Sequence, residues 1–417
     1  MAPGATPRRF AILYVLAMFG AFIAFMPLGA LVLPAKIAQI DAIDGSAAQV
    51  QALSWLLAAG GVMAAVGNIG AGYLSDVLYR RHGNRRRMVL IGLTAVVAAL
   101  GALAAAQDFA ELMLAVLAFQ LALNGLLSPL FALMVDHVPD AAKGRMAGWL
   151  GLALPVGSLS VAGLAAAPPI GPLGQLGAMA VATVVLVAPL ALFWSAPARI
   201  EPSVAPPASD PARDRTGLAG SFALAWIARL LVQFAAAAIL PYLYYYVAYV
   251  ARPGASATAI SAAVGMLSLA FTIASVLGGL LVGWLSDHAR HRQVVLAGSA
   301  VLVAISMAML AMMSLWPLVV MAYALFAVGL AGFLAVDSAL VAQLISASAR
   351  RATLLGVMNL TNTLPGILAP LVTLAVIGDG GGDAGRMIIV LQLSAVGALV
   401  AAGCAGLIRV PISKRPG

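Results

Sequence analysis

Long apolar runs alternate with short polar connections along the chain. Each run has about 20 or more residues with few charges, the length that a helix needs to cross a bilayer core. Backbone groups in lipid must bond within their own segment, and the runs do not alternate apolar and polar residues every second position. They therefore predict helices rather than strands. The runs lie near 10–39, 49–75, 88–107, 110–135, 146–167, 173–195, 221–250, 257–285, 293–314, 316–345, 354–378 and 387–409.

A polar segment divides these twelve runs into two sets of six. Residues 196–220 are rich in Pro, Ala, Ser and charged residues, a composition typical of a flexible linker. The sequence therefore predicts an N-terminal six-helix bundle over 1–195 and a C-terminal six-helix bundle over 221–417.

Composition supports a membrane location. Of the 417 residues, 63% are hydrophobic and 9% are charged, and the mean hydropathy is +1.05. In a soluble domain about a quarter of the residues are charged, so this chain has too few charges to cover a water-facing surface. The net charge of +9 comes from short basic clusters between apolar runs and not from one basic face. We therefore expect a lipid bilayer as the partner and no nucleic acid.

The basic residues also predict the orientation. If the N-terminus is cytoplasmic, all but four of the 23 Lys and Arg fall on the cytoplasmic side. The exceptions are Lys36, Arg252 and Arg386, which fall outside, and Arg229, which falls within a span. By the positive-inside rule, both termini are cytoplasmic in a bacterial-type plasma (inner) membrane. The first run is too long for a signal peptide and is the first span.

One short motif occurs once in each half. "GYLSD" occupies 72–76 and "GWLSD" occupies 283–287, each at the end of a predicted span and each followed by basic residues. A second similarity between the two halves relates Ala132-Leu133 in the fourth run to Ala339-Leu340 in the tenth run. Both copies of the motif lie on the same side of the membrane. This predicts two parallel six-helix repeats related by an axis along the membrane normal.

The first copy, "GYLSDVLYRRHGNRRR", resembles the signature of the loop between spans two and three in the major facilitator superfamily, Gly-x-Leu-x-Asp followed by Gly-x-Arg-Arg. The gap between Asp76 and Gly83 is longer than in typical drug exporters. In this respect the chain is similar to the glycoside and sucrose cation-symporter branches. Three other stretches are also similar to this superfamily: "NGLLSPLFALMVDHVPDAAKGRMAG", "AVDSALVAQLI" and "GVMNLTNTLPGILAP". The second copy of the motif departs from the family pattern, because Arg290 stands where the family has glycine.

This resemblance covers nearly the whole chain. It implies a twelve-helix secondary transporter that works by alternating access, with spans one, four, seven and ten around a central cavity.

We expect the motif to form a conformational latch. Gly72 would let two helices approach closely, and Asp76 would accept hydrogen bonds from a helix N-terminus or pair with an arginine across the boundary between the halves. The alternative is that the basic residues only anchor the loop at the membrane surface. The expected latch residues are Gly72, Asp76, Gly83, Arg85, Arg86, Gly283 and Asp287.

Two ionisable residues lie deep within predicted spans, Arg229 in span seven and Asp337 in span ten. Charges inside a membrane are costly, so both are functional candidates. Burial disfavours a charged carboxylate and a nearby guanidinium favours it, so Asp337 is the expected proton-coupling group with Arg229 as its partner. A single buried acid fits a proton better than a sodium cage. A permanent structural salt bridge is the alternative.

Uncharged polar residues on candidate lining helices predict the substrate cavity. The amides could bind a hydroxylated solute or bond between helices. The tyrosines of "YLYYYVAYV" form either an interfacial aromatic belt, which we favour, or an outer gate. Pro241 predicts a break in the helix before them. The expected cavity residues are Gln120, Asn124, Gln233, Tyr242, Tyr245, Asn359 and Asn362.

The sequence thus predicts a proton-driven importer of a small polar, sugar-like or glycoside-like solute, acting as a monomer. Proton-driven efflux of lipophilic or drug-like compounds is the alternative. No ATP-binding loop, paired carboxylates, nucleophile triad or metal-ligand cluster is found in the sequence. We therefore expect neither an enzyme nor a bound cofactor or metal.

Overall fold

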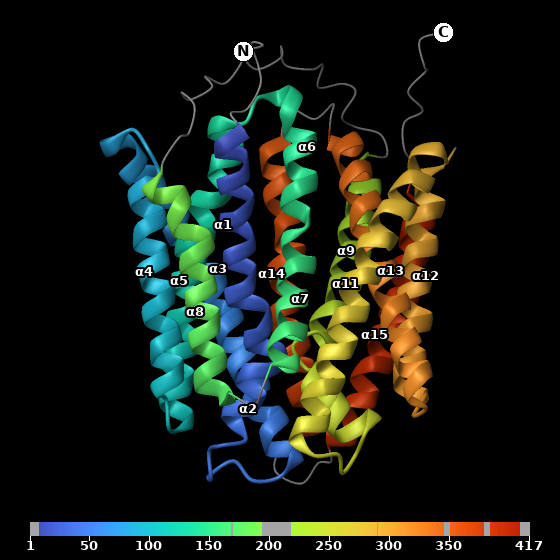
Figure 1. The fold of residues 1–417 in the computed structure, drawn as a ribbon. Coiled ribbons are helices and arrows are strands. Elements are labelled where there is room, and N and C mark those ends of the chain that lie inside the picture. The colour runs from blue at the N-terminus through green and yellow to red at the C-terminus, as the bar shows by residue number, and fades with distance from the viewer. Residues whose placement is uncertain are drawn as a thin grey trace. The chain divides into compact units, whose positions relative to one another are not determined.

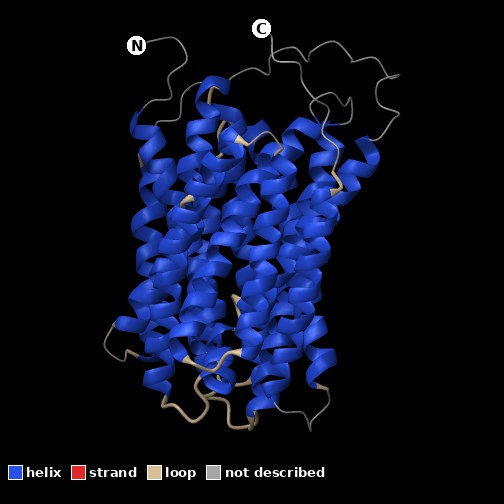
Figure 2. Ribbon diagram, turned by 90° about the vertical axis from the view of Figure 1, so that its right-hand side faces the viewer, coloured by secondary structure: helices blue, strands red, loops and turns tan. Residues whose placement is uncertain are grey.

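The computed structural model describes residues 8–167, 170–193, 218–289, 291–345, 351–378 and 384–408. Every regular element in these ranges is a helix, as the blue ribbons of Figure 2 show. Twelve of the described helical segments are long and apolar enough to cross a membrane (Figure 1). The predicted fold class, an all-α protein with twelve membrane-spanning helices, is confirmed.

The first half of the chain supplies six spans. An interruption after Pro27 takes the form of a π-helical turn, and a proline ring inside a helix removes one backbone donor. The elements are α1 (Arg8–Pro27), η1 (Leu28–Val32) and α2 (Leu33–Ile37) for span one, then α3 (Ser46–His82), α4 (Arg86–Ala105), α5 (Phe109–His137), α6 (Asp140–Gly151) with α7 (Ala153–Ala166), and α8 (Gly171–Leu192).

The second half supplies the other six spans. Its elements are α9 (Leu218–Ile239), α10 (Leu243–Tyr246) and η3 (Val247–Ala251) for span seven, then α11 (Ala257–His288), α12 (Arg292–Met312), α13 (Trp316–Ile345), α14 (Arg351–Ile377), η4 (Ala384–Arg386) and α15 (Met387–Gly406). The interruption expected at Pro241 is present, because α9 ends before this proline and α10 begins after it.

The described helices cluster into two compact units. Unit 1 contains α1 to α8 together with Tyr242–Val247 and Gly254–Leu269, which come from the second half of the sequence. Unit 2 contains α9, Ala248–Pro253 and the chain from Ala270 onward. Span seven is therefore divided between the units twice, at its proline break and again after Val247. The predicted linker, 196–220, lies largely outside the described residues.

The same helix packing occurs in both units. In unit 1, α4 packs against α5 and α8, and α1 packs against α7 and α8; in unit 2, α12 packs against α13 and α15, and α9 packs against α14 and α15. A Cβ added at Gly92 of α4 would lie 2.7 Å from the backbone of Leu126. A Cβ added at Gly329 of α13 would lie 2.9 Å from Val303. Glycine thus allows the matching pair of helices to approach closely in each repeat.

Candidate functional site

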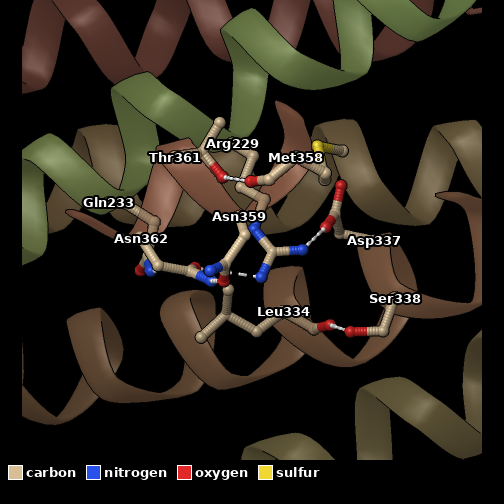
Figure 3. Close-up of polar contacts among 9 residues, drawn as sticks. All are labelled: Arg229, Gln233, Leu334, Asp337, Ser338, Met358, Asn359, Thr361 and Asn362. Carbon is tan, nitrogen blue, oxygen red and sulfur yellow. Dashed lines mark hydrogen bonds and ion pairs between the residues drawn. The ribbon is translucent and has the colours of Figure 1, made fainter. Parts of the chain in front are cut away.

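A charged pair lies inside unit 2. Arg229 Nη1 of α9 donates a hydrogen bond of 2.7 Å to Asp337 Oδ2 of α13 (Figure 3). The side chain of Asp337 is 0% exposed and that of Arg229 is 17% exposed. The two ionisable residues that the sequence places within spans seven and ten are therefore in direct contact.

This pair leaves two polar atoms without hydrogen bonds. Asp337 Oδ1 and Arg229 Nε are both buried, and neither has a partner among the described residues. A buried polar atom without a partner costs about 1–3 kcal/mol, so such atoms are rare in stable cores. The open carboxylate oxygen is also the atom at which Asp337 can accept a proton without first breaking its bond to Arg229.

Three amides extend the pair into a network that reaches α14. Asn362 Oδ1 accepts hydrogen bonds from Arg229 Nη2 at 3.1 Å and from Gln233 Nε2 at 3.2 Å, and Asn362 Nδ2 donates to Asn359 Oδ1 at 2.9 Å. Figure 3 shows these side chains converging on the guanidinium. Asn359 and Asn362 are exposed, so their amides retain hydrogen-bonding capacity for another molecule.

Helical spacing explains how the sequence builds this network. Arg229 and Gln233 are four residues apart on α9, and Asn359 and Asn362 are three residues apart on α14. Residues at these spacings lie on one helix face. Each helix therefore presents two polar side chains together, and α13 contributes Asp337 alone. No group of three or more His, Cys, Asp or Glu side chains that could hold a metal is found among the residues that the structure describes.

The amides expected in span four belong to a different cluster, in unit 1. Asn124 Nδ2 donates to the backbone oxygen of Gln120 at 2.9 Å, and Asn124 Oδ1 accepts from Asn68 Nδ2 at 3.5 Å. Gln120 lies against α3, where a Cβ added at Gly60 would be 3.3 Å from its side chain. These amides therefore join α3 to α5. Sequence reasoning missed Asn68, a polar residue inside the second apolar run.

The expected tyrosines also lie in unit 1. Tyr242 and Tyr245 are both 0% exposed, so an aromatic belt at the membrane interface is the wrong interpretation for these two rings. The hydroxyls of Tyr242 and Ser54 are 2.7 Å apart. Ser54 donates its own proton to Val50 O at 2.8 Å, so Tyr242 is the donor to Ser54. This bond attaches the short helix α10 to α3.

Arg85 organises the first copy of the motif. Its Nε donates to Asp136 Oδ2 at 2.6 Å, and its Nη1 donates to Ser75 Oγ at 2.7 Å and to Asp76 Oδ1 at 3.0 Å. The side chains of Arg85 and Asp136 are 8% and 7% exposed, whereas that of Asp76 is 62% exposed. The buried carboxylate that pairs with Arg85 is therefore Asp136. The sequence analysis did not select this residue, although it is an acid at the end of the fourth apolar run.

One expectation for the latch residues was wrong, and another stays a prediction. The ion pair described at Asp76 is with Arg85 of its own unit, and the expected pairing across the boundary between the halves stays a prediction. A Cβ added at Gly72 would meet only Ser128 Oγ at 3.7 Å, and one at Gly283 would meet no atom within 4 Å, so neither glycine marks a close helix approach. Gly83 has a conformational role instead, because it caps α3 with a φ of 70°.

The other latch residues are on the surface. Arg86 is exposed at the start of α4. Asp287, in the second copy of the motif, pairs with Arg292 at 3.0 Å, and the two side chains are 70% and 28% exposed.

Lys36, which the charge count assigns to the outer side of the membrane, is a buried cation. It lies in α2 and is 8% exposed. Its Nζ donates to Ala104 O at 3.2 Å and to Ala106 O at 2.6 Å. These carbonyls are at the C-terminal end of α4, where the helix dipole favours a positive charge. Lys36 therefore caps a helix.

Twelve apolar spans in two repeats of the same packing define a multi-pass membrane protein. Residues 10–370 match the family model of the Major Facilitator Superfamily, and the chain therefore belongs to this superfamily. A search of curated proteins finds no match.

Two solved structures show the same fold. A bacterial homologue of the human lysosomal transporter Spinster, in its inward-facing and unoccupied conformation, aligns with a TM-score of 0.68 and 14% identity over 96% of this chain and 97% of that chain. Its inward-facing and occupied conformation aligns with a TM-score of 0.69 and 16% identity over 97% of each chain. At these identities the likeness concerns the fold alone. The resemblance to the glycoside and sucrose cation symporters is not confirmed by these comparisons.

Proposed function

We propose that this superfamily transporter couples the movement of a small polar solute to a proton, and that Asp337 carries the proton. The observation that supports this most directly is the half-satisfied carboxylate, in which Oδ2 bonds Arg229 and Oδ1 is buried without a partner. A carboxylate inside a membrane span gains or loses its proton as its surroundings change. Arg229 keeps its charge throughout, so the acid carries the change.

Protonation of Asp337 changes what Arg229 can bind. A proton on Oδ1 neutralises the carboxyl and weakens its attraction for the guanidinium. Arg229 then remains anchored through Nη2 to Asn362, while Nη1 becomes available to an oxygen of the solute. Loss of the proton on the other side of the membrane restores the ion pair and displaces the solute. Alternating access supplies the change of side.

The amides around Arg229 favour a hydroxylated, sugar-like or glycoside-like solute. Gln233, Asn359 and Asn362 offer donors and acceptors at a single face, and two of the three are exposed. We propose import across a bacterial-type inner membrane with both termini cytoplasmic. Proton-driven efflux of lipophilic compounds remains the alternative that the transport assay distinguishes.

The test uses purified protein in proteoliposomes with a pH-sensitive dye inside. A thermal-shift panel of glycosides, organic anions and lipophilic cations first selects a stabilising compound. We expect a stabilising glycoside to accumulate under an inward proton gradient and to acidify the lumen. Asp337→Asn abolishes accumulation but retains exchange down the solute gradient, and Asp41→Asn, an exposed acid, behaves as wild type.

Two results would contradict the proposal. If Asp337→Asn moves protons with solute at the wild-type ratio, Asp337 is only a structural partner of Arg229. If glycosides neither stabilise nor accumulate, and lipophilic cations are expelled instead, the efflux alternative replaces import.

A further inference from the structure

The turn between α3 and α4 has more positive charge than its acids neutralise. Five arginines lie between positions 80 and 87. Arg85 with its two carboxylates, Asp76 and Asp136, has a net charge of −1, so the four remaining arginines leave the group at +3. These four arginines are all exposed, and none forms an ion pair with a described carboxylate: Arg80, Arg81, Arg86 and Arg87.

The backbone brings the four charges to one place. Gly83, in the left-handed conformation, ends α3 with a hydrogen bond of 2.8 Å from its N–H to Tyr79 O. The next helix begins only three residues later, at Arg86. Two guanidinium groups at the end of one span thus lie across a short turn from two at the start of the next. We call this group of four the arginine turn.

Apolar side chains border the arginine turn on both helices. Tyr73 and Leu74 on α3 are 70% and 45% exposed, and Ile91 on α4 is 50% exposed. Each lies between one and two helical turns from the nearest of the four arginines. A soluble anion would use only the charges. An amphiphile with an anionic headgroup and acyl chains would use the charges and the apolar surface together.

We propose that the arginine turn binds the headgroup of an anionic phospholipid. Guanidinium groups bind phosphate through paired N–H donors, and basic residues that flank a membrane span attract anionic lipid headgroups. The four arginines contact the phosphate and glycerol oxygens, and the acyl chains lie along Tyr73, Leu74 and Ile91. The second copy of the motif lacks this arrangement in its described part, because Arg292 is paired with Asp287.

The test counts lipids that remain bound to the full-length protein in detergent by native mass spectrometry. The probes are dioleoyl-phosphatidylglycerol and dioleoyl-phosphatidylcholine, and inorganic phosphate is the competitor. We expect wild type to retain phosphatidylglycerol selectively. The double substitution Arg80→Gln/Arg81→Gln lowers its affinity on the order of 25-fold, since each arginine near the surface contributes about five-fold. Arg80→Lys/Arg81→Lys retains most of the binding, because the charge is kept.

Arg386→Gln is the matched control, because this arginine is exposed at a different helix end. It leaves the retention of phosphatidylglycerol unchanged. Equal retention of both lipids by wild type, or an equal loss in the control, overturns the proposal. Full displacement by phosphate identifies a soluble-anion site instead. If the double variant does not fold, the single variants Arg81→Gln and Arg87→Gln decide, each with an expected loss of about five-fold.

Discussion

Among the residues that the structure describes, each unit contains one buried arginine–aspartate pair of nearly equal length, and the two pairs differ in how completely they are bonded. Arg85 in unit 1 donates to three acceptors at the end of its span. Arg229 in unit 2 lies within a span, where it and Asp337 each leave one buried atom without a partner. The ion pair alone therefore does not identify a coupling site. Our proposal that Asp337 carries the proton rests on its unbonded carboxylate oxygen and not on the ion pair.

The second copy of the motif supports this distinction. Arg290 stands at the position of Gly83, so Arg292 stands at the position of Arg85, and it pairs with Asp287 as Arg85 pairs with Asp76. In the spacing that relates Ala132 to Ala339, Gln343 stands at the position of Asp136. The second half thus keeps the arginine and replaces the buried acid, and Arg292 and Asp287 are 28% and 70% exposed. Among the described residues, the buried pair at this position is a feature of the first repeat.

The largest expected effect is on Arg85. Arg85→Leu leaves Asp136 buried without a cation, so we expect a loss of stability of about 3–5 kcal/mol, measured by unfolding in detergent micelles. The double substitution Arg85→Leu/Asp136→Gln removes both buried charges, with glutamine as in the second repeat at Gln343, and it restores most of this loss because no charge stays buried. A double variant as unstable as Arg85→Leu would show that the two side chains do not act as a pair.

The next effect is smaller, at Asp337. Asp337→Asn retains an oxygen that can accept from Arg229 and removes the buried oxygen that has no partner. Arg229 also keeps its bond to Asn362 and is partly exposed. We expect a loss of about 1–2 kcal/mol, smaller than that of Arg85→Leu. A loss as large as that of Arg85→Leu would mean that both ion pairs hold helices together. The proposed difference between the two pairs would then be wrong.

The sequence predicted the spans well because their signal is collective. Some 20 apolar residues outweigh any local irregularity, so the twelve runs and the break at Pro241 agree with the structure. Which charged side chains pair with one another, in contrast, depends on single contacts between segments that are distant in the sequence. The direct contact of Asp337 with Arg229 fits the rule that buried charges are paired. The sequence offered several acids for Arg85, and which of them is buried is decided by the packing of α5.

The sequence also could not predict which aromatic side chains are buried. A run of tyrosines at a span end is typical of a membrane interface. Whether a ring faces lipid or another helix depends on how α10 packs, and this helix clusters with unit 1. Local sequence contains no information on that choice.

The third prediction concerns an uncharged buried bond. Tyr242→Phe removes the donor to Ser54 but keeps the buried ring, so we expect a loss of about 1 kcal/mol. Ser54→Ala removes the other partner of the same bond, so we expect a loss of similar size, about 1 kcal/mol. The double variant should lose less than the sum of the two, as expected for residues in contact. Additive losses in the same unfolding assay would show that the hydroxyls do not interact.

The smallest expected effect on stability is at the exposed acids of the two motif copies. Asp76 and Asp287 each form a single ion pair with most of the carboxylate in solvent, so replacing either by Asn changes stability by less than about 1 kcal/mol. Their roles in transport still differ, because Asp76 shares its arginine with the buried Asp136. We expect Asp76→Asn to slow turnover several-fold in proteoliposomes, since the loop then loses one of its two acidic anchors, and Asp287→Asn to have the weaker effect. Equal turnover in the two variants would show that the buried pair in the first repeat has no influence on the latch. A stability change of several kcal/mol at Asp76 would show that this carboxylate fastens helices, as Asp136 does.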